Sequence, residues 1–183
     1  LHLCHHNLEN INDVNNIDND TLLLEVCMAA KYEAQSLKNY HAQYRGNNTD
    51  LNTNICTELA RSFADIGDIV RGKDPFYGNT YESKQRENLE KNLKDIFGKI
   101  HSGLSKNGAQ ARYNGDTDNY YELREYWWAL NRNDVWKAIT CGHPGGTYFR
   151  KTCSKGESHV KDKCTCINGD PPTFLDYVPQ FLR

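Results

Sequence analysis

Apolar residues recur along much of the chain at the spacing of amphipathic helices. The clearest stripe has intervals of 4, 4, 3 and 4 residues, which fit a helix with 3.6 residues per turn. This stripe consists of Ile55, Leu59, Phe63, Ile66 and Val70. Gly72 follows it, at the place where a left-handed glycine commonly ends a helix. The pattern therefore predicts a helix that begins near residue 55 and ends at Gly72.

Two longer stripes flank this helix. Before it, apolar positions between residues 23 and 44 predict a helix that Asp20 or Thr21 can cap and that Gly46 ends. After it, apolar positions over residues 89–104 predict a third helix. All three helices would bury one face against their neighbours.

A fourth helical stretch is expected from Asp118 to Leu130. Its tandem Trp127 and Trp128 point about 100° apart on a helix, so we expect one ring in the core and the other against a partner element. Asn133 is a common capping residue type, and it is expected to start a separate helical turn.

The pattern changes between residues 143 and 172. This stretch has glycines, prolines and three cysteines but no lasting apolar period, so we expect an irregular segment held by disulfides. Phe174, Val178 and Phe181 then return at helical spacing and predict the entry to another helix, in which Pro179 disturbs the pattern. The expected fold class is mostly α, with disulfide-held irregular loops.

Charge and hydropathy exclude two classes of protein. The chain has 22 Lys and Arg against 24 Asp and Glu, a net charge of −2, so it lacks the large cationic field of a nucleic-acid-binding protein. Glu25 interrupts the most apolar stretch, residues 22–30, so no membrane span is expected.

Seven cysteines are many for a cytosolic chain of 183 residues, and they indicate disulfides formed in an oxidising compartment. Cys4, at the edge of the chain, is the expected unpaired one. The disulfide candidates are Cys27, Cys56, Cys141, Cys153, Cys164 and Cys166. Pairing stays open, with Cys27 joined to Cys56 or Cys141 and Cys153 joined to Cys164 or Cys166. The alternative is a set of reduced, buried thiols.

Signatures of catalysis and of metal binding are not found. Cys164 and Cys166 are one residue apart and lack the second ligand pair of a structural zinc site. The chain contains no Gly-x-Ser-x-Gly, cysteine-protease, Walker or Gly-x-Gly-x-x-Gly sequence. We therefore expect no catalytic residues, no metal and no cofactor.

Two clusters of basic residues are the candidate binding surfaces. One lies on the predicted third helix and the other in the cysteine-rich segment. The first comprises Lys84, Arg86, Lys91, Lys94 and Lys99, and the second Arg150, Lys151, Lys155, Lys161 and Lys163. Either cluster could bind sulfated, heparan-sulfate-like glycans through charge-assisted contacts. The alternative is a solvated face whose charge is balanced by nearby glutamates.

Four strings carry a more specific signal. They are LHLC with NLE over residues 1–9, ADIGDIVRGKD over residues 64–74, LREYWW with NR and VWKAITC over residues 123–141, and DYVPQFLR over residues 176–183. In this order they resemble the Duffy-binding-like domain, alpha class, of the malaria parasite's variant erythrocyte membrane protein 1. The resemblance covers essentially the whole chain.

The resemblance implies a helical adhesion domain fragment on the outer face of the infected red-cell membrane, anchored by a segment outside this chain. The implied partners are receptors on host red cells or endothelium, glycans such as those used in rosetting, and antibodies against a variable surface. A structural spacer that carries antigenic surface without touching a receptor is the alternative.

The resemblance also implies a division of the chain. Residues 1–20 would be the end of a first subdomain and a linker, 21–142 a helical second subdomain, 143–172 a cysteine-rich variable loop, and 173–183 the start of a third helical subdomain. On this interpretation the chain is the middle of a larger domain.

Overall fold

The computed structural model describes residues 18–47, 54–74, 80–104, 112–113, 115–142, 148–160 and 162–183, and it confirms the mostly helical fold. Within these ranges there are four α-helices and no strand. The helices are α2 (Asn19–Asn47), α3 (Ile55–Arg71), α4 (Thr80–Leu104) and α5 (Tyr121–Thr140). The short 3₁₀ turns η4 (Ser154–Gly156), η5 (Leu175–Tyr177) and η6 (Gln180–Leu182) follow.

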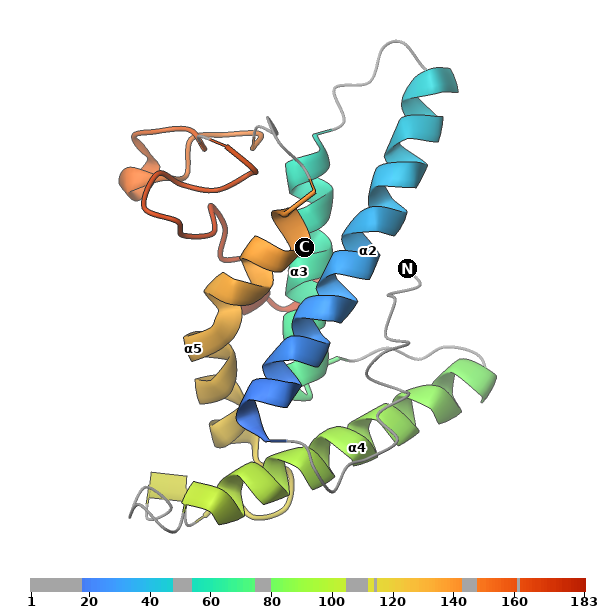
Figure 1. The fold of residues 1–183 in the computed structure, drawn as a ribbon, viewed down its shortest axis with the longest axis vertical. Coiled ribbons are helices and arrows are strands. Elements are labelled where there is room, and N and C mark those ends of the chain that lie inside the picture. Colours follow the sequence, from blue (N-terminus) through green and yellow to red (C-terminus); the bar gives the residue numbers. More distant parts are fainter. Residues whose placement is uncertain are drawn as a thin grey trace.

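Helices α2, α3 and α5 pack side by side as a bundle, and α4 crosses one end of it (Figure 1). α2 and α5 run in the same direction. The Trp127 indole N–H donates to Asn19 Oδ1 (2.8 Å) near the start of both helices, and Lys38 Nζ donates to the Gly142 carbonyl (3.5 Å) further along. The segment after residue 148 returns to α3, where η5 packs against it.

Both ends of α3 have the capping groups that its sequence favours. Asn54 Oδ1 accepts a hydrogen bond from the Cys56 backbone N–H (3.0 Å) at the N-terminus. At the C-terminus Gly72 is left-handed, with φ of 69°, as the sequence predicted. A Cβ there would lie 2.9 Å from Arg124 Nη1, so glycine also makes room for that side chain.

The core is centred on aromatic rings from α3 and α5. Phe63 packs between Trp128 and Trp136, with both ring centroids 5.1 Å away. Trp127 lies on another side of α5 and meets Phe97 of α4 edge to face at 6.1 Å. Both tandem tryptophans are buried, one towards α3 and the other towards α4, as expected from their positions on one helix.

Two expected boundaries are wrong. α5 continues through Asn133 without a break, because Arg132 and Val135 on either side of it are buried and the Asn133 amide donates to Asp170 (3.3 Å) instead of capping a helix. The C-terminal segment forms two separate 3₁₀ turns, η5 and η6, because Pro179 between them has extended backbone and cannot donate a helical hydrogen bond. The α2 start is shifted slightly: Asp18 Oδ1 accepts from the Thr21 N–H (2.9 Å).

Gly67 permits close packing of α3 on α5, which leads to a testable expectation. A Cβ at Gly67 would lie 2.8 Å from Trp128 Cζ2 in the centre of the core, so Gly67→Ala should lower the free energy of unfolding by about 2 kcal/mol. Gly103→Ala is the matched control, since no atom lies within 4 Å of its added Cβ, and it should be neutral or slightly stabilising. Urea denaturation measures both; equal effects would contradict the packing.

Candidate receptor-binding surfaces and the arginine network beneath them

Asp176 is a fully buried carboxylate at the centre of a network of charged residues. Its two oxygens accept from Arg132, with Nε to Oδ2 at 2.8 Å and Nη2 to Oδ1 at 2.9 Å, and the Trp128 indole N–H donates to Oδ2 at 2.9 Å. Arg132 also donates to the Thr173 carbonyl (2.9 Å). Two residues of α5 therefore hold the C-terminal segment by its one buried aspartate.

Arginines from two more segments extend the network to α3. Arg71 donates to Asp68 Oδ1 (3.0 Å) and to the Asp176 backbone carbonyl. Arg183 contacts the carboxylates of both Asp65 (3.0 Å) and Asp68. Bidentate or multiple pairing of this kind is needed to offset the loss of hydration when guanidinium groups are buried.

Arg124 connects α3, α4 and α5 at the C-terminal end of α3. Its side chain is fully buried and donates to the carbonyls of Ile69 (3.1 Å) and Val70 (2.6 Å) in the last turn of α3, where carbonyls lack the usual helical partner four residues ahead. The same guanidinium makes two contacts with Glu90 of α4, at 2.7 and 2.9 Å. Arg124 thus places α4 relative to the bundle.

These pairs were not anticipated from the sequence, although the residues lie in the strings that carry the family resemblance. A signal was present: Asp68 and Arg71 fall in the strongly apolar helix 55–71, where a charge that faces the core needs a partner. Asp68 and Arg71 pair with each other, but the sequence does not identify their distant partners, because Asp176 and Arg183 lie more than a hundred residues away.

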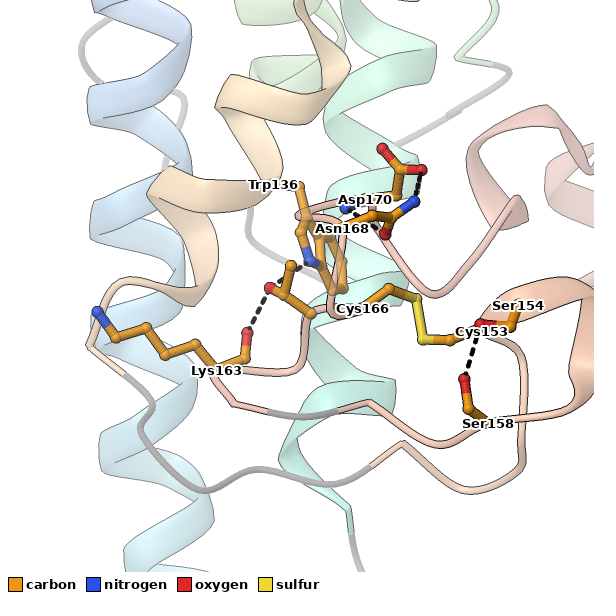
Figure 2. Close-up of a disulfide and its surroundings, with 9 residues drawn as sticks. Trp136, Cys153, Ser154, Ser158, Lys163, Cys166, Asn168 and Asp170 are labelled. Atoms are coloured by element: carbon orange, nitrogen blue, oxygen red, sulfur yellow. Dashed lines mark hydrogen bonds between the residues drawn. A yellow bond between two sulfur atoms is a disulfide. The ribbon is translucent and has the colours of Figure 1, made fainter.

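The cysteine-rich segment is attached to this framework by two disulfides. Cys56 of α3 is bonded to Cys164, and Cys153 is bonded to Cys166. Figure 2 shows the second bond and a hydrogen-bonded chain beside it: the Trp136 indole N–H donates to Thr165 Oγ1 (3.2 Å), and this hydroxyl donates to the Lys163 carbonyl (2.9 Å). A core residue of α5 thereby fixes the backbone at Lys163.

The disulfide pattern corrects one expected pairing. Cys56 bonds to Cys164, so it does not bond to Cys27, and Cys27 and Cys141 are both free thiols. Cys27 and Cys141 lie at different heights along α2. Lys38 contacts Gly142, the neighbour of Cys141, and Cys27 lies eleven residues before Lys38, about 16 Å along the helix. A disulfide needs Cα atoms within roughly 7 Å. Burial raises the pKa of the Cys27 thiol to about 11, so this group stays protonated at neutral pH. Cys4 lies outside the described residues.

The basic residues of the cysteine-rich segment form an exposed cationic loop, defined here as Arg150, Lys151, Lys155 and Lys163. All four are exposed, and within the described residues none forms a salt bridge with a carboxylate. Arg150 stacks over the half-exposed Phe149 ring at 4.4 Å. Lys155 and Lys163 have left-handed backbone, with φ of 59° and 50°, which is costly for a residue with a Cβ. Lys161, the fifth expected member, lies outside the described residues.

The basic residues of α4 are arranged differently. Arg86 is half-buried and pairs with Asp74 (2.5 Å), so its charge is already neutralised. Lys84 and Lys91 are exposed on the side opposite Leu89 and Leu93, while Lys94 and Lys99 are half-buried. Arg86, Lys91 and Lys94 border one pocket with Asp74, Glu87 and Glu90. The α4 surface is therefore of mixed charge, and the structure does not gather its five basic residues into one patch.

The described residues contain neither a cluster of metal-binding side chains nor a membrane-spanning helix. Among the described residues no three His, Cys, Asp or Glu side chains are grouped closely enough to hold a metal ion. The helices in the same ranges are too short or too polar to cross a bilayer.

A sequence model of the Duffy binding domain family matches residues 1–183. The chain belongs to this family. Among curated protein sequences none matches the chain.

Solved structures of Duffy binding domains are similar to it. The NTS-DBL1(alpha-1) domain of the Plasmodium falciparum membrane protein 1 (PfEMP1) from the varO strain has 42% identity and a TM-score of 0.76, over 99% of this chain and 40% of that chain. The ICAM-1-binding PfEMP1 IT4var13 DBLbeta domain has 33% identity and a TM-score of 0.69, over 100% and 39%. The same domain bound to ICAM-1 gives 31% and 0.68, over 99% and 40%.

The chain thus spans about two fifths of the length of these Duffy binding domain structures. It is similar to a PfEMP1 adhesion domain over its whole length, and the helical fold and the disulfides agree with the resemblance seen in the sequence. The division into subdomains stays a prediction.

The carboxylates that Arg183 binds lead to a pH prediction. Burial raises the pKa of Asp65 and of Asp68 above the usual value, although Arg183 opposes the shift. As the pH falls, each of these carboxylates binds a proton in the folded chain at a higher pH than in the unfolded chain. Their protonation therefore increases the free energy of unfolding as the pH falls from neutral towards about 4.

Asp65→Asn imitates the protonated form and should leave the free energy of unfolding at pH 7 unchanged or raise it. It should also reduce the gain that the wild-type chain shows on acidification. Urea denaturation at pH 7 and pH 5 measures both quantities. A clear loss of stability at pH 7 would mean that the ion pair with Arg183 outweighs the cost of burial.

Proposed function

We propose that this chain is part of a cell-adhesion domain that binds a receptor or sulfated glycan on the host cell surface, and that the cationic loop is its contact surface. Membership of the Duffy binding domain family and similarity to PfEMP1 domains, one of them bound to ICAM-1, support an adhesion role. By the same resemblance, the domain acts on the outer face of the infected red cell.

The observation that carries the choice of surface is the contrast between the two basic clusters. The cations of the loop are exposed and have no carboxylate partner among the described residues, so no ion pair must be broken before a ligand binds. Arg86 on α4 is already paired with Asp74. A sulfate group gains more from an unpaired guanidinium or ammonium than from one that must exchange partners.

Rigidity of the loop also favours it as a contact surface. The Cys153–Cys166 disulfide, the Cys56–Cys164 disulfide and the Trp136–Thr165 hydrogen bond hold the backbone that carries Lys163 and Lys155. Left-handed, non-glycine residues persist only where the surroundings enforce them, and they concentrate at functional sites. A preordered loop loses little conformational entropy when a ligand binds.

The test compares two fourfold variants of the oxidised chain on immobilised heparin over a salt series. In the loop variant Arg150, Lys151, Lys155 and Lys163 are changed to Ser. In the control the four lysines of α4, Lys84, Lys91, Lys94 and Lys99, are changed to Ser. The two sets remove the same charge, and circular dichroism checks that the helices are retained.

The loop variant should lose roughly 30-fold in affinity, because four exposed charge contacts contribute about 0.5 kcal/mol each, and its salt dependence should flatten. The α4 variant should change less than about threefold. If the α4 variant loses more affinity for heparin than the loop variant, the contact surface lies on α4 and not on the loop. Absence of binding by the wild-type chain to heparin and to intact red cells would favour a structural spacer with antigenic surface.

A further inference from the structure

A second cavity lies where α4, α5 and the first residue of α2 meet, at the end of the bundle where α4 crosses it (Figure 1). Its volume is about 450 Å³, within the usual range for a small-molecule site. None of the residues of the cationic loop lines this cavity, so it is separate from the proposed adhesion surface.

The wall of this cavity is apolar. Ile100 and Leu104 come from α4, and Leu123, Trp127 and Leu130 come from α5. The indole N–H of Trp127 is already bonded to Asn19 Oδ1 (2.8 Å), so the ring offers its apolar face and its polar group is satisfied. Leu130 is 63% exposed in the described structure, so a bound hydrocarbon would remove apolar surface from water.

A single charge lies at the rim. Among the described lining residues Arg112 is the only charged one, and no carboxylate lines the cavity with it. The Arg112 guanidinium lies over the ring of the 46% exposed Tyr126, 6.0 Å from its centroid, and forms no salt bridge with a described carboxylate. Among the described residues, the cavity therefore combines a mainly apolar interior with one cation at its edge that has no carboxylate partner.

We infer that this cavity binds a small amphipathic anion, with an apolar body against Trp127 and Leu104 and a terminal carboxylate or sulfate on Arg112. Burial of the hydrocarbon supplies most of the affinity, and the charge-assisted contact with Arg112 gives preference for anions over cations. The inference does not depend on the adhesion role or on the cationic loop.

The test uses decanoate as the probe, with decyltrimethylammonium as the cationic analogue and acetate as the headgroup alone, all below their micelle concentrations. Binding is followed by NMR through the three indole N–H signals of the wild-type chain. Decanoate should shift the Trp127 signal saturably and leave in place the signals of Trp128 and Trp136, which do not line the cavity, while acetate should shift none.

Two variants define the contacts. Arg112→Gln should weaken decanoate binding about tenfold, as expected for loss of one charge-assisted contact. Arg61→Gln is the control, because Arg61 of α3 is also an exposed arginine and does not line the cavity, and it should leave decanoate binding unchanged. Leu104→Trp, which fills the cavity, should abolish the shift.

Three results would overturn the inference: no saturable shift of the Trp127 signal, equal binding of decyltrimethylammonium, or equal effects of Arg112→Gln and Arg61→Gln. Circular dichroism checks the helix content of each variant. The comparison of decanoate with decyltrimethylammonium uses the wild-type chain, so a poorly folded variant does not leave the inference undecided.

Discussion

The buried carboxylate of Asp176 is the interaction on which the arrangement of the other segments depends. It accepts from Arg132 and Trp128 of α5, while the backbone carbonyl of the same residue accepts from Arg71 of α3. A buried ion pair contributes little net stability compared with apolar packing, but loss of one partner leaves an unpaired buried charge. We infer that the network determines how α3, α5 and the C-terminal segment pack against one another.

This framework explains how an exposed loop with little core of its own can keep a defined shape. Along the chain, the segment from residue 148 to residue 170 lies between α5 and the turn that carries Asp176, and it is joined to the start of α3 by Cys56–Cys164 and closed on itself by Cys153–Cys166. Side chains at its surface, such as Lys155, do not take part in those attachments. A surface of this kind can change its side chains with little effect on the fold, which is compatible with the adhesion role proposed above.

Periodicity predicted the helices well because it records which face is buried. The stripe from Ile55 to Val70 became α3 with both caps in place, and the tandem tryptophans divided between two neighbours as their 100° separation requires. Local signals failed where tertiary contacts decided the outcome. Asn133 bonds to Asp170 and does not start a new helix. The C-terminal apolar spacing did not produce a helix, because Pro179 and the contacts of Asp176 fix another conformation.

Two long-range pairings could not be predicted from the sequence. The choice of Cys164 for Cys56, 108 residues apart, follows from the return of the chain to α3, which no local pattern encodes. The same is true of Arg71, whose partner Asp176 is 105 residues distant. The two basic clusters looked alike in the sequence, and only the structure separates Arg86, which is paired with Asp74, from the loop cations, which have no carboxylate partner among the described residues.

Hydrogen exchange of an Asp176→Asn variant tests the central role of this carboxylate most directly, with Asp162→Asn, an exposed aspartate of the same segment, as the control. Asp176→Asn should lose protection in residues 148–183 and along the facing parts of α3 and α5, while α2 and α4 keep theirs, because the buried Arg132 loses its anionic partner. If exchange in the Asp176→Asn variant matches that of the Asp162→Asn control throughout, the Asp176 carboxylate is not needed to position these segments, and apolar packing alone determines the fold.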